Sequence, residues 1–295
     1  MNKREGGGAG LPAYAALICI TAIWGASFVW VRDAVAVYPV FPFLAVRFSL
    51  AALLVGATLA PRLAKARWAS FGGGVVMGAA LFSGYALQTL GLKYTTAANS
   101  GFITGLFVVF TPLFEAIISR RWPRMLVIAG VLLATAGLGA LSLESGIGRV
   151  NPGDLLSIAC AAVYAVHLIL TSRLSRQHDT APLVAGQLAT VAALAWLCSA
   201  PHWTSLAPVP WPAVKGILLT AVFASALAYF VQTAFQRKVS ATQAALIFAL
   251  EPVFAGIFAF WIGGEKLGGS ALLGGALIIA GMVMGEMGSR KESLD

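Results

Sequence analysis

The sequence has few charged residues. Asp, Glu, Lys and Arg make up 11% of its 295 residues, whereas an average soluble domain has about 25%. Acidic residues are the scarcer kind, with 11 against 20 basic ones. The hydrophobic share is 59% and the mean hydropathy is +0.85. Because a bilayer-spanning helix needs about 20 mostly apolar residues, this composition indicates a membrane protein and excludes a large soluble catalytic domain.

Cysteine and histidine are also scarce, at three residues each. The cysteines lie inside apolar stretches, where a free cysteine behaves as a small hydrophobic residue. The sequence has no disulfide framework, zinc spacing, P-loop or Gly-x-Ser-x-Gly elbow. We therefore expect no enzyme, no cofactor and no metal site. The net charge of +9 is spread over short loops rather than gathered on one face, so we expect no nucleic-acid partner either.

Apolar runs of spanning length, separated by charged and turn residues, predict ten transmembrane helices. The runs lie near residues 12–31, 39–59, 70–92, 96–119, 125–143, 154–173, 182–200, 212–235, 241–261 and 270–287. With this count, fourteen Lys and Arg residues fall on one side of the membrane and five on the other, with Arg47 inside the second span. Cytoplasmic loops keep an excess of Lys and Arg, so we expect both termini to be cytoplasmic.

The two halves of the chain resemble each other. A shift of 144 residues aligns Tyr85 with Tyr229, Gln88 with Gln232, Thr89 with Thr233, Gly130 with Gly274 and Gly137 with Gly281. Because each half has an odd number of spans, the second half enters the membrane from the opposite side. The predicted fold is an all-α membrane protein of ten transmembrane helices in two inverted five-helix repeats, residues 12–143 and 154–287. Inverted repeats permit alternating access, which favours a transporter over a receptor, a channel or an assembly factor.

Polar side chains inside apolar spans are costly and usually face protein or a water-filled cavity. Several occur at equivalent places in the two halves, and a shift of 140 residues relates the first and sixth spans. We predict that ten such residues line a substrate cavity near the membrane midplane. They are Trp24, Ser27, Tyr85, Gln88, Asn99, Tyr164, His167, Tyr229, Gln232 and Gln243. The alternative is that their amides and hydroxyls join helices by hydrogen bonds, worth about 0.6 kcal/mol each.

Charged residues inside the spans limit the substrate. Glu251 and His167 are the candidates for proton coupling, although Glu251 beside a proline also suits a structural role and His167 a neutral contact between helices. We expect Arg120 or Arg121 to neutralise Glu115. We expect Arg47 to extend outward to the membrane surface, with binding of a substrate carboxylate as the alternative. A phosphorylated cargo would need several basic residues, so a neutral or zwitterionic substrate is favoured.

Four short features resemble a known repeat. They are Arg47-Phe48, the region of Ala97 and Ala241 that opens the fourth and ninth spans, Leu250-Glu251-Pro252 and Gly264-Glu265-Lys266-Leu267. They are similar to the duplicated EamA repeat of the ten-helix branch of the drug/metabolite transporter superfamily. The first repeat departs from the pattern, with Arg121 at the position of Glu265 and Val108 at that of Pro252.

Within that superfamily the chain is most similar to bacterial amino-acid exporters of the aromatic and threonine type. The resemblance implies a multi-pass protein of the bacterial inner membrane that exports neutral, hydrophobic or aromatic amino acids or similar metabolites. The alternatives are efflux of drug-like amphiphiles and a pore-forming channel. The expected partners are a small-molecule substrate and the lipid bilayer. Glycines in the fifth and tenth spans predict that these two helices pack together, with a homodimer as the alternative use of the same surface.

Overall fold

The structure, a computed structural model, describes residues 10–91, 94, 103–142, 152–200, 208–263 and 268–292. Within these ranges the chain is helical and contains no strand. The helices are α1 (Leu11–Val35), α2 (Val40–Thr58), α3 (Ala60–Leu63), α4 (Trp68–Gly91), α6 (Phe107–Ser119), α7 (Met125–Ser142), α8 (Pro152–Gln177), α9 (Thr180–Cys198), α10 (Trp211–Leu219), the π-helix η3 (Thr220–Leu227), α11 (Ala228–Gln236), α12 (Ala241–Phe248), α13 (Glu251–Gly263) and α14 (Gly269–Glu292).

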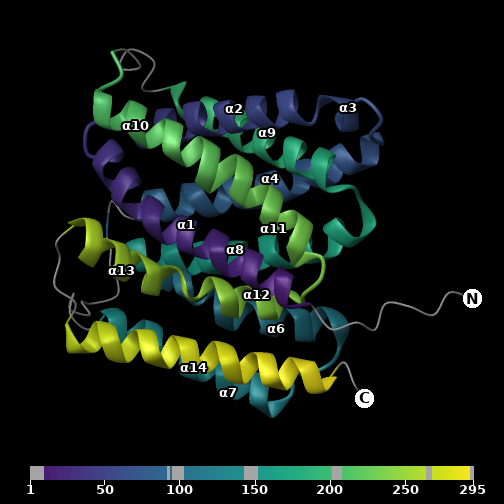
Figure 1. Cartoon of the computed structure of the whole chain (residues 1–295), viewed down its shortest axis with the longest axis vertical. Coiled ribbons are helices and arrows are strands. Elements are labelled where there is room, and N and C mark those ends of the chain that lie inside the picture. The colour runs from purple at the N-terminus through teal and green to yellow at the C-terminus, as the bar shows by residue number, and fades with distance from the viewer. Residues whose placement is uncertain are drawn as a thin grey trace, which may run out of the picture.

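The described helices account for the ten predicted spans. Seven segments are long and apolar enough to cross a membrane, and three shorter apolar helices complete the set. α10, η3 and α11 join into one continuous eighth span, and α12 and α13 form the ninth with a break at Ala249 and Leu250. α1 begins and α14 ends at the same end of the bundle (Figure 1), as an even number of spans requires.

The two repeats pack crosswise on each other. α4 of the first repeat packs on α8 and α9 of the second, while its equivalent, the eighth span, packs on α1 and α2 of the first. Likewise α1 packs on α12 and α13, and its equivalent α8 packs on α6. Each of these contacts between the repeats therefore has a counterpart in which the two repeats exchange roles. Two inverted five-helix repeats related by an approximate twofold axis produce this arrangement.

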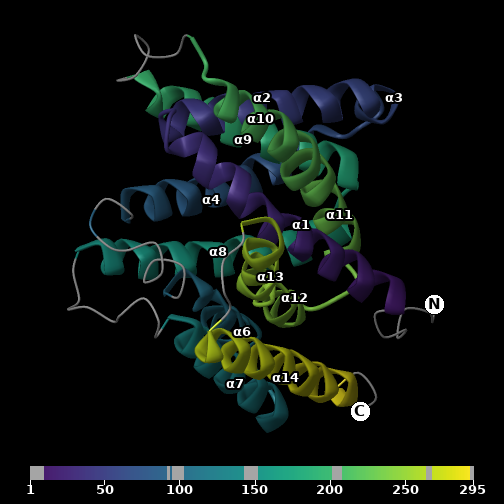
Figure 2. The same ribbon diagram turned by 60° about the vertical axis from the view of Figure 1, so that its left-hand side comes forward.

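α7 and α14, the fifth and tenth spans, lie side by side along one edge of the bundle (Figures 1 and 2). Their glycines bring the backbones together: a Cβ on Gly137 would lie 2.6 Å from the carbonyl oxygen of Gly274, and one on Gly130 would lie 2.6 Å from that of Gly281. These two contacts exchange under the 144-residue shift. The predicted packing of these spans is confirmed. Because these glycines are in contact within one chain, they do not form the contact surface of a homodimer.

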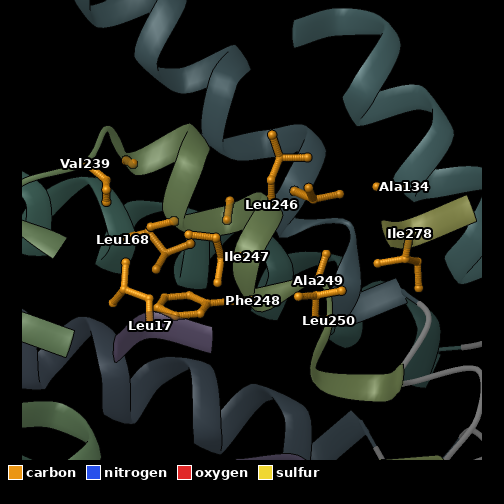
Figure 3. Close-up of a cluster of buried hydrophobic side chains, with 14 of the residues drawn as sticks. Leu17, Ala134, Leu168, Val239, Leu246, Ile247, Phe248, Ala249, Leu250 and Ile278 are labelled. Carbon is orange, nitrogen blue, oxygen red and sulfur yellow. The ribbon is translucent and has the colours of Figure 1, made fainter. Parts of the chain in front are cut away.

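The short helix α12 lies at the centre of one hydrophobic core. Leu246, Ile247 and Phe248 are almost fully buried, together with Leu17 of α1 and Leu168 of α8. Figure 3 shows these side chains gathered around α12. α12, the first half of the ninth span, is therefore packed against helices of both repeats.

The first turn of α12 is held by side-chain caps. The Ser240 hydroxyl accepts from the Gln243 N–H and the Gln243 side-chain oxygen accepts from the Ser240 N–H, which forms a capping box. The Glu115 carboxylate of α6 accepts from both the N–H and the hydroxyl of Thr242. The expectation that Glu115 pairs with a following arginine is therefore wrong. A carboxylate at a helix N-terminus is stabilised by the free N–H groups and by the helix dipole.

Candidate functional site

Five aromatic side chains from both repeats meet in the middle of the bundle. We call this group the aromatic centre; it comprises Trp24 of α1, Phe48 of α2, Tyr85 of α4, Tyr164 of α8 and Tyr229 of α11. The ring centroids of Tyr229 lie 5.7 Å from Trp24 and 6.2 Å from Phe48. Those of Tyr85 lie 5.5 Å from Phe48 and 6.2 Å from Tyr164. Tilted and edge-to-face rings at such distances attract each other.

A hydrogen bond joins the two halves at the aromatic centre. The hydroxyls of Tyr85 and Tyr229 are 2.9 Å apart, and the two residues are separated by the 144 positions of the repeat shift. A residue that contacts its own equivalent lies on the axis that relates the repeats. The aromatic centre is therefore the point about which the two repeats are arranged.

The eighth span carries a π-helical segment beside the aromatic centre. In η3 the backbone leaves the α-helical hydrogen-bonding pattern, and the carbonyl oxygen of Ala224 accepts a bond of 2.9 Å from the indole N–H of Trp24. The equivalent stretch in the first repeat, residues 76–83, lies inside the uninterrupted helix α4. π-Helical turns occur frequently at functional sites because they free backbone groups for other contacts. The first and second repeats therefore differ here.

Arg47 contacts the same π-helical segment. Its side chain is 4% exposed, and its Nε donates to the Ser225 hydroxyl at 2.8 Å. The expectation that Arg47 extends outward to the membrane surface is wrong. The hydroxyl and carbonyl groups of η3 hold the guanidinium inside the bundle, and the Phe48 ring lies 5.1 Å from it.

Two separate sets of buried polar side chains extend from the aromatic centre, one between α8 and α9 and the other between α8 and α11. His167 lies 6.5 Å from the Tyr229 ring, centre to centre, and 3.1 Å from the side-chain nitrogen of Gln187 on α9. Gln232 donates to Gln236 at 2.9 Å, and Gln236 donates to Ser172. Gln187 and Gln236 were missing from the predicted set. The 140-residue shift that aligns the first and sixth spans places Gln187 on Arg47, so the repeat itself could have indicated it.

The other predicted residues differ in their placement. Gln88 lies half-buried on α4, one turn after Tyr85, and Glu251 is half-buried at the start of α13. The hydroxyl of Ser27 donates to the carbonyl of Trp24 in its own helix. Gln243 is not brought to the aromatic centre, because its side chain caps α12 and donates to Tyr14 and Glu286. Asn99 lies outside the described residues.

The side chains of this region are of kinds that bind a small molecule by non-covalent contacts. Aromatic faces, amides and hydroxyls make contacts with apolar groups and form hydrogen bonds. In the part of the chain that the structure describes, no three His, Cys, Asp or Glu side chains gather as metal ligands.

Comparison with known proteins agrees with the fold. Residues 11–143 and 151–285 each match the family described as "EamA-like transporter family". An uncharacterized transporter of Archaeoglobus fulgidus is 32% identical over 288 residues, covering 96% of this chain and 89% of its own. The uncharacterized transporter YvbV of Bacillus subtilis is 28% identical, covering 73% and 72%. A solved crystal structure shares the fold, with a TM-score of 0.78 and 21% identity over 92% of this chain and 96% of its own. The chain is a multi-pass membrane protein that belongs to the EamA-like transporter family.

Proposed function

We propose that this protein is a secondary carrier that exports neutral amino acids with hydrophobic or aromatic side chains, or similar metabolites, by alternating access. The aromatic centre is the observation that carries the proposal. It lies where equivalent helices of the two repeats meet, and Tyr85 and Tyr229 contact each other across the axis. A site on such an axis opens to either side of the membrane when the two repeats exchange conformations.

The residues of the site have complementary roles in this proposal. Trp24, Tyr85, Tyr164 and Tyr229 surround the substrate side chain, since aromatic faces bind apolar and aromatic groups and attract an ammonium group. Gln88 on α4 supplies hydrogen bonds to the substrate backbone. Gln232 and His167, with Gln187, form the polar wall on the side of α8, α9 and α11. In this proposal Ser27 and Asn99 remain in the lining, and Gln243 is left out.

Proton coupling has two candidate groups. Glu251 and His167 are the titratable side chains that the proposal places at the site, and a facilitated uniporter needs neither. An imposed pH gradient across proteoliposomes distinguishes these mechanisms. If the gradient drives accumulation in the wild type and in His167→Gln but not in Glu251→Gln, Glu251 carries the proton. If no gradient changes the accumulation, the protein is a uniporter.

We place the protein in the bacterial cytoplasmic membrane with both termini in the cytoplasm. The proposal is supported by the loops of one side, which carry most of the Lys and Arg residues. Reporter fusions to the C-terminus that are active either in the cytoplasm or outside it test this orientation directly.

The central experiment is counterflow in proteoliposomes. The purified protein is reconstituted with an unlabelled amino-acid mixture inside, and uptake of labelled phenylalanine, methionine and threonine is compared with protein-free vesicles. Saturable accumulation stimulated by internal substrate supports the proposed carrier. Non-saturable flux indicates a channel. If the folded protein accumulates none of the labelled amino acids, the substrate is instead assigned as a drug-like amphiphile.

Variants locate the site in the same assay. Gln88→Ala and Gln232→Ala are expected to reduce transport while the protein still folds. Leu53→Ala, on the exposed face of α2, is the matched control, because 69% of the surface of Leu53 is exposed. Normal transport by both glutamine variants would contradict the proposed cavity.

A further inference from the structure

Arg47 is a buried cation whose contacts in the described chain are with neutral groups. Its guanidinium donates to the Ser225 hydroxyl at 2.8 Å and to the Ala224 carbonyl at 3.5 Å, and it lies against the ring of Phe48. The arginine is 4% exposed. Such a charge is expensive to hold inside a membrane protein without a counter-charge.

The guanidinium has capacity for a further ligand. Arginine has five N–H donors in a planar fork that matches a carboxylate. The contacts with η3 use two of these donors, and the longer of them is at the limit of hydrogen-bonding distance. The remaining donors have no acceptor among the described residues, so an incoming anion is able to bind without breaking the bond to Ser225.

This capacity lies next to the aromatic centre. The Phe48 ring contacts both Tyr85 and Tyr229. The Ala224 carbonyl that Arg47 contacts also accepts from Trp24. A molecule placed among these rings therefore has the Arg47 guanidinium at one side of it.

The equivalent position in the second repeat carries no charge. α2 and α9 begin 140 residues apart and both have proline as their third residue, Pro42 and Pro182. At this shift Arg47 is equivalent to Gln187, a neutral amide bonded to His167. The fold of the repeat therefore does not require a cation at this position.

From these contacts we infer that Arg47 binds the carboxylate of the transported substrate. The inference rests on the proposed function, and it specifies the substrate as a molecule with a carboxylate next to an apolar or aromatic group. Amines without a carboxylate are excluded. The π-helical segment η3 positions the guanidinium by accepting from one of its edges and leaving the other edge for the ligand.

The first test uses competition in the counterflow assay. Unlabelled phenylalanine and 3-phenylpropionate, which carry a carboxylate, are expected to compete with labelled phenylalanine, and phenethylamine is expected not to. Loss of a charge-assisted contact corresponds to at least about tenfold weaker binding. Arg47→Gln is therefore expected to raise the concentration of phenylalanine needed for half-maximal transport about tenfold or more. Arg47→Lys is expected to retain part of the affinity, and Leu53→Ala on the same helix all of it. Unchanged affinity in a folded Arg47→Gln variant would overturn the inference.

The second test does not depend on transport. The thermal unfolding of the purified wild type is measured with 3-phenylpropionate and with its neutral amide. Stabilisation by the acid alone supports the inference, while equal stabilisation by both, or by neither, overturns it. If amino acids are not transported, but the acid still stabilises the wild type selectively and has no such effect on a folded Arg47→Gln variant, the proposed function fails and the assignment of Arg47 stands.

Discussion

The hydrogen bond between Tyr85 and Tyr229 permits a quantitative test of the repeat symmetry. A hydrogen bond between membrane helices contributes about 0.6 kcal/mol on average and at most about 1.7 kcal/mol. Replacing one tyrosine by phenylalanine also leaves the other hydroxyl without its partner, and Tyr229 is 4% exposed. An unsatisfied buried group costs about 1–3 kcal/mol. Each single variant is therefore expected to lose about 1–2 kcal/mol of stability.

The double variant distinguishes this bond from two independent contacts. Tyr85→Phe with Tyr229→Phe removes both hydroxyls, so no polar group stays unpaired. Its loss is expected to be no larger than that of either single variant. The assay is unfolding of the purified proteins by titration with a denaturing detergent, followed by circular dichroism. If the losses of the two single variants add up in the double variant, the hydroxyls do not act on each other and the reasoning is refuted.

The symmetry of the repeats also predicts in which conformations the bond between Tyr85 and Tyr229 is present. When two inverted repeats exchange conformations, a contact between equivalent residues is converted into itself. The bond between Tyr85 and Tyr229 therefore belongs to both end states, and its removal is expected to lower stability without favouring either. Alkylation of single cysteines placed at the two ends of the bundle measures this balance. A shift of several-fold toward one side would show that the bond belongs to a single state.

Three further predictions concern single contacts. Gly84→Ala is expected to reduce transport, because the new methyl group would collide with the ring of Tyr164; Gly56→Ala, with no atom within 4 Å, is the control, and equal counterflow rates would contradict this. Gly137→Ala is expected to lower the free energy of unfolding by about 1–3 kcal/mol, because α14 must move away; an unchanged unfolding midpoint would contradict the close approach of α7 and α14. Glu115→Gln is expected to cost about 1 kcal/mol through the weakened cap of α12, with little effect on the substrate concentration for half-maximal transport. A large change in that concentration would place Glu115 at the site instead.

Much of the fold could be predicted from the sequence. Spanning helices satisfy their backbone internally and must be apolar over a fixed length, so apolar runs bounded by charged and turn residues are enough to predict the ten segments. The 144-residue shift also indicates residues near the axis between the repeats. It aligns Tyr85 with Tyr229, and the structure places these two residues in direct contact. Glycines aligned by the same shift marked the contact between α7 and α14.

The parts that could not be predicted depend on contacts between segments far apart in the chain. The direction of Arg47 is decided by Ser225, and η3 has no proline or other sequence signal that marks a change of helix type. Gln243 was grouped with the site because it aligns with Asn99, yet its place at the start of a helix gave it a capping role. Alignment of repeats identifies equivalent positions, but neighbouring helices decide what each side chain contacts.

Two of the differences between the repeats lie beside the aromatic centre. The axis carries an equivalent pair of tyrosines. The segment of the first repeat that is equivalent to η3 is part of the uninterrupted helix α4, and the residue of the second repeat that is equivalent to Arg47 is the neutral Gln187. Symmetric parts are what alternating access needs, because the two end states then have similar energies. Binding an asymmetric molecule needs the opposite, since its charged and apolar ends require different surroundings. The chain meets both requirements by keeping symmetry in the helix packing and placing the asymmetry in a few side chains beside η3.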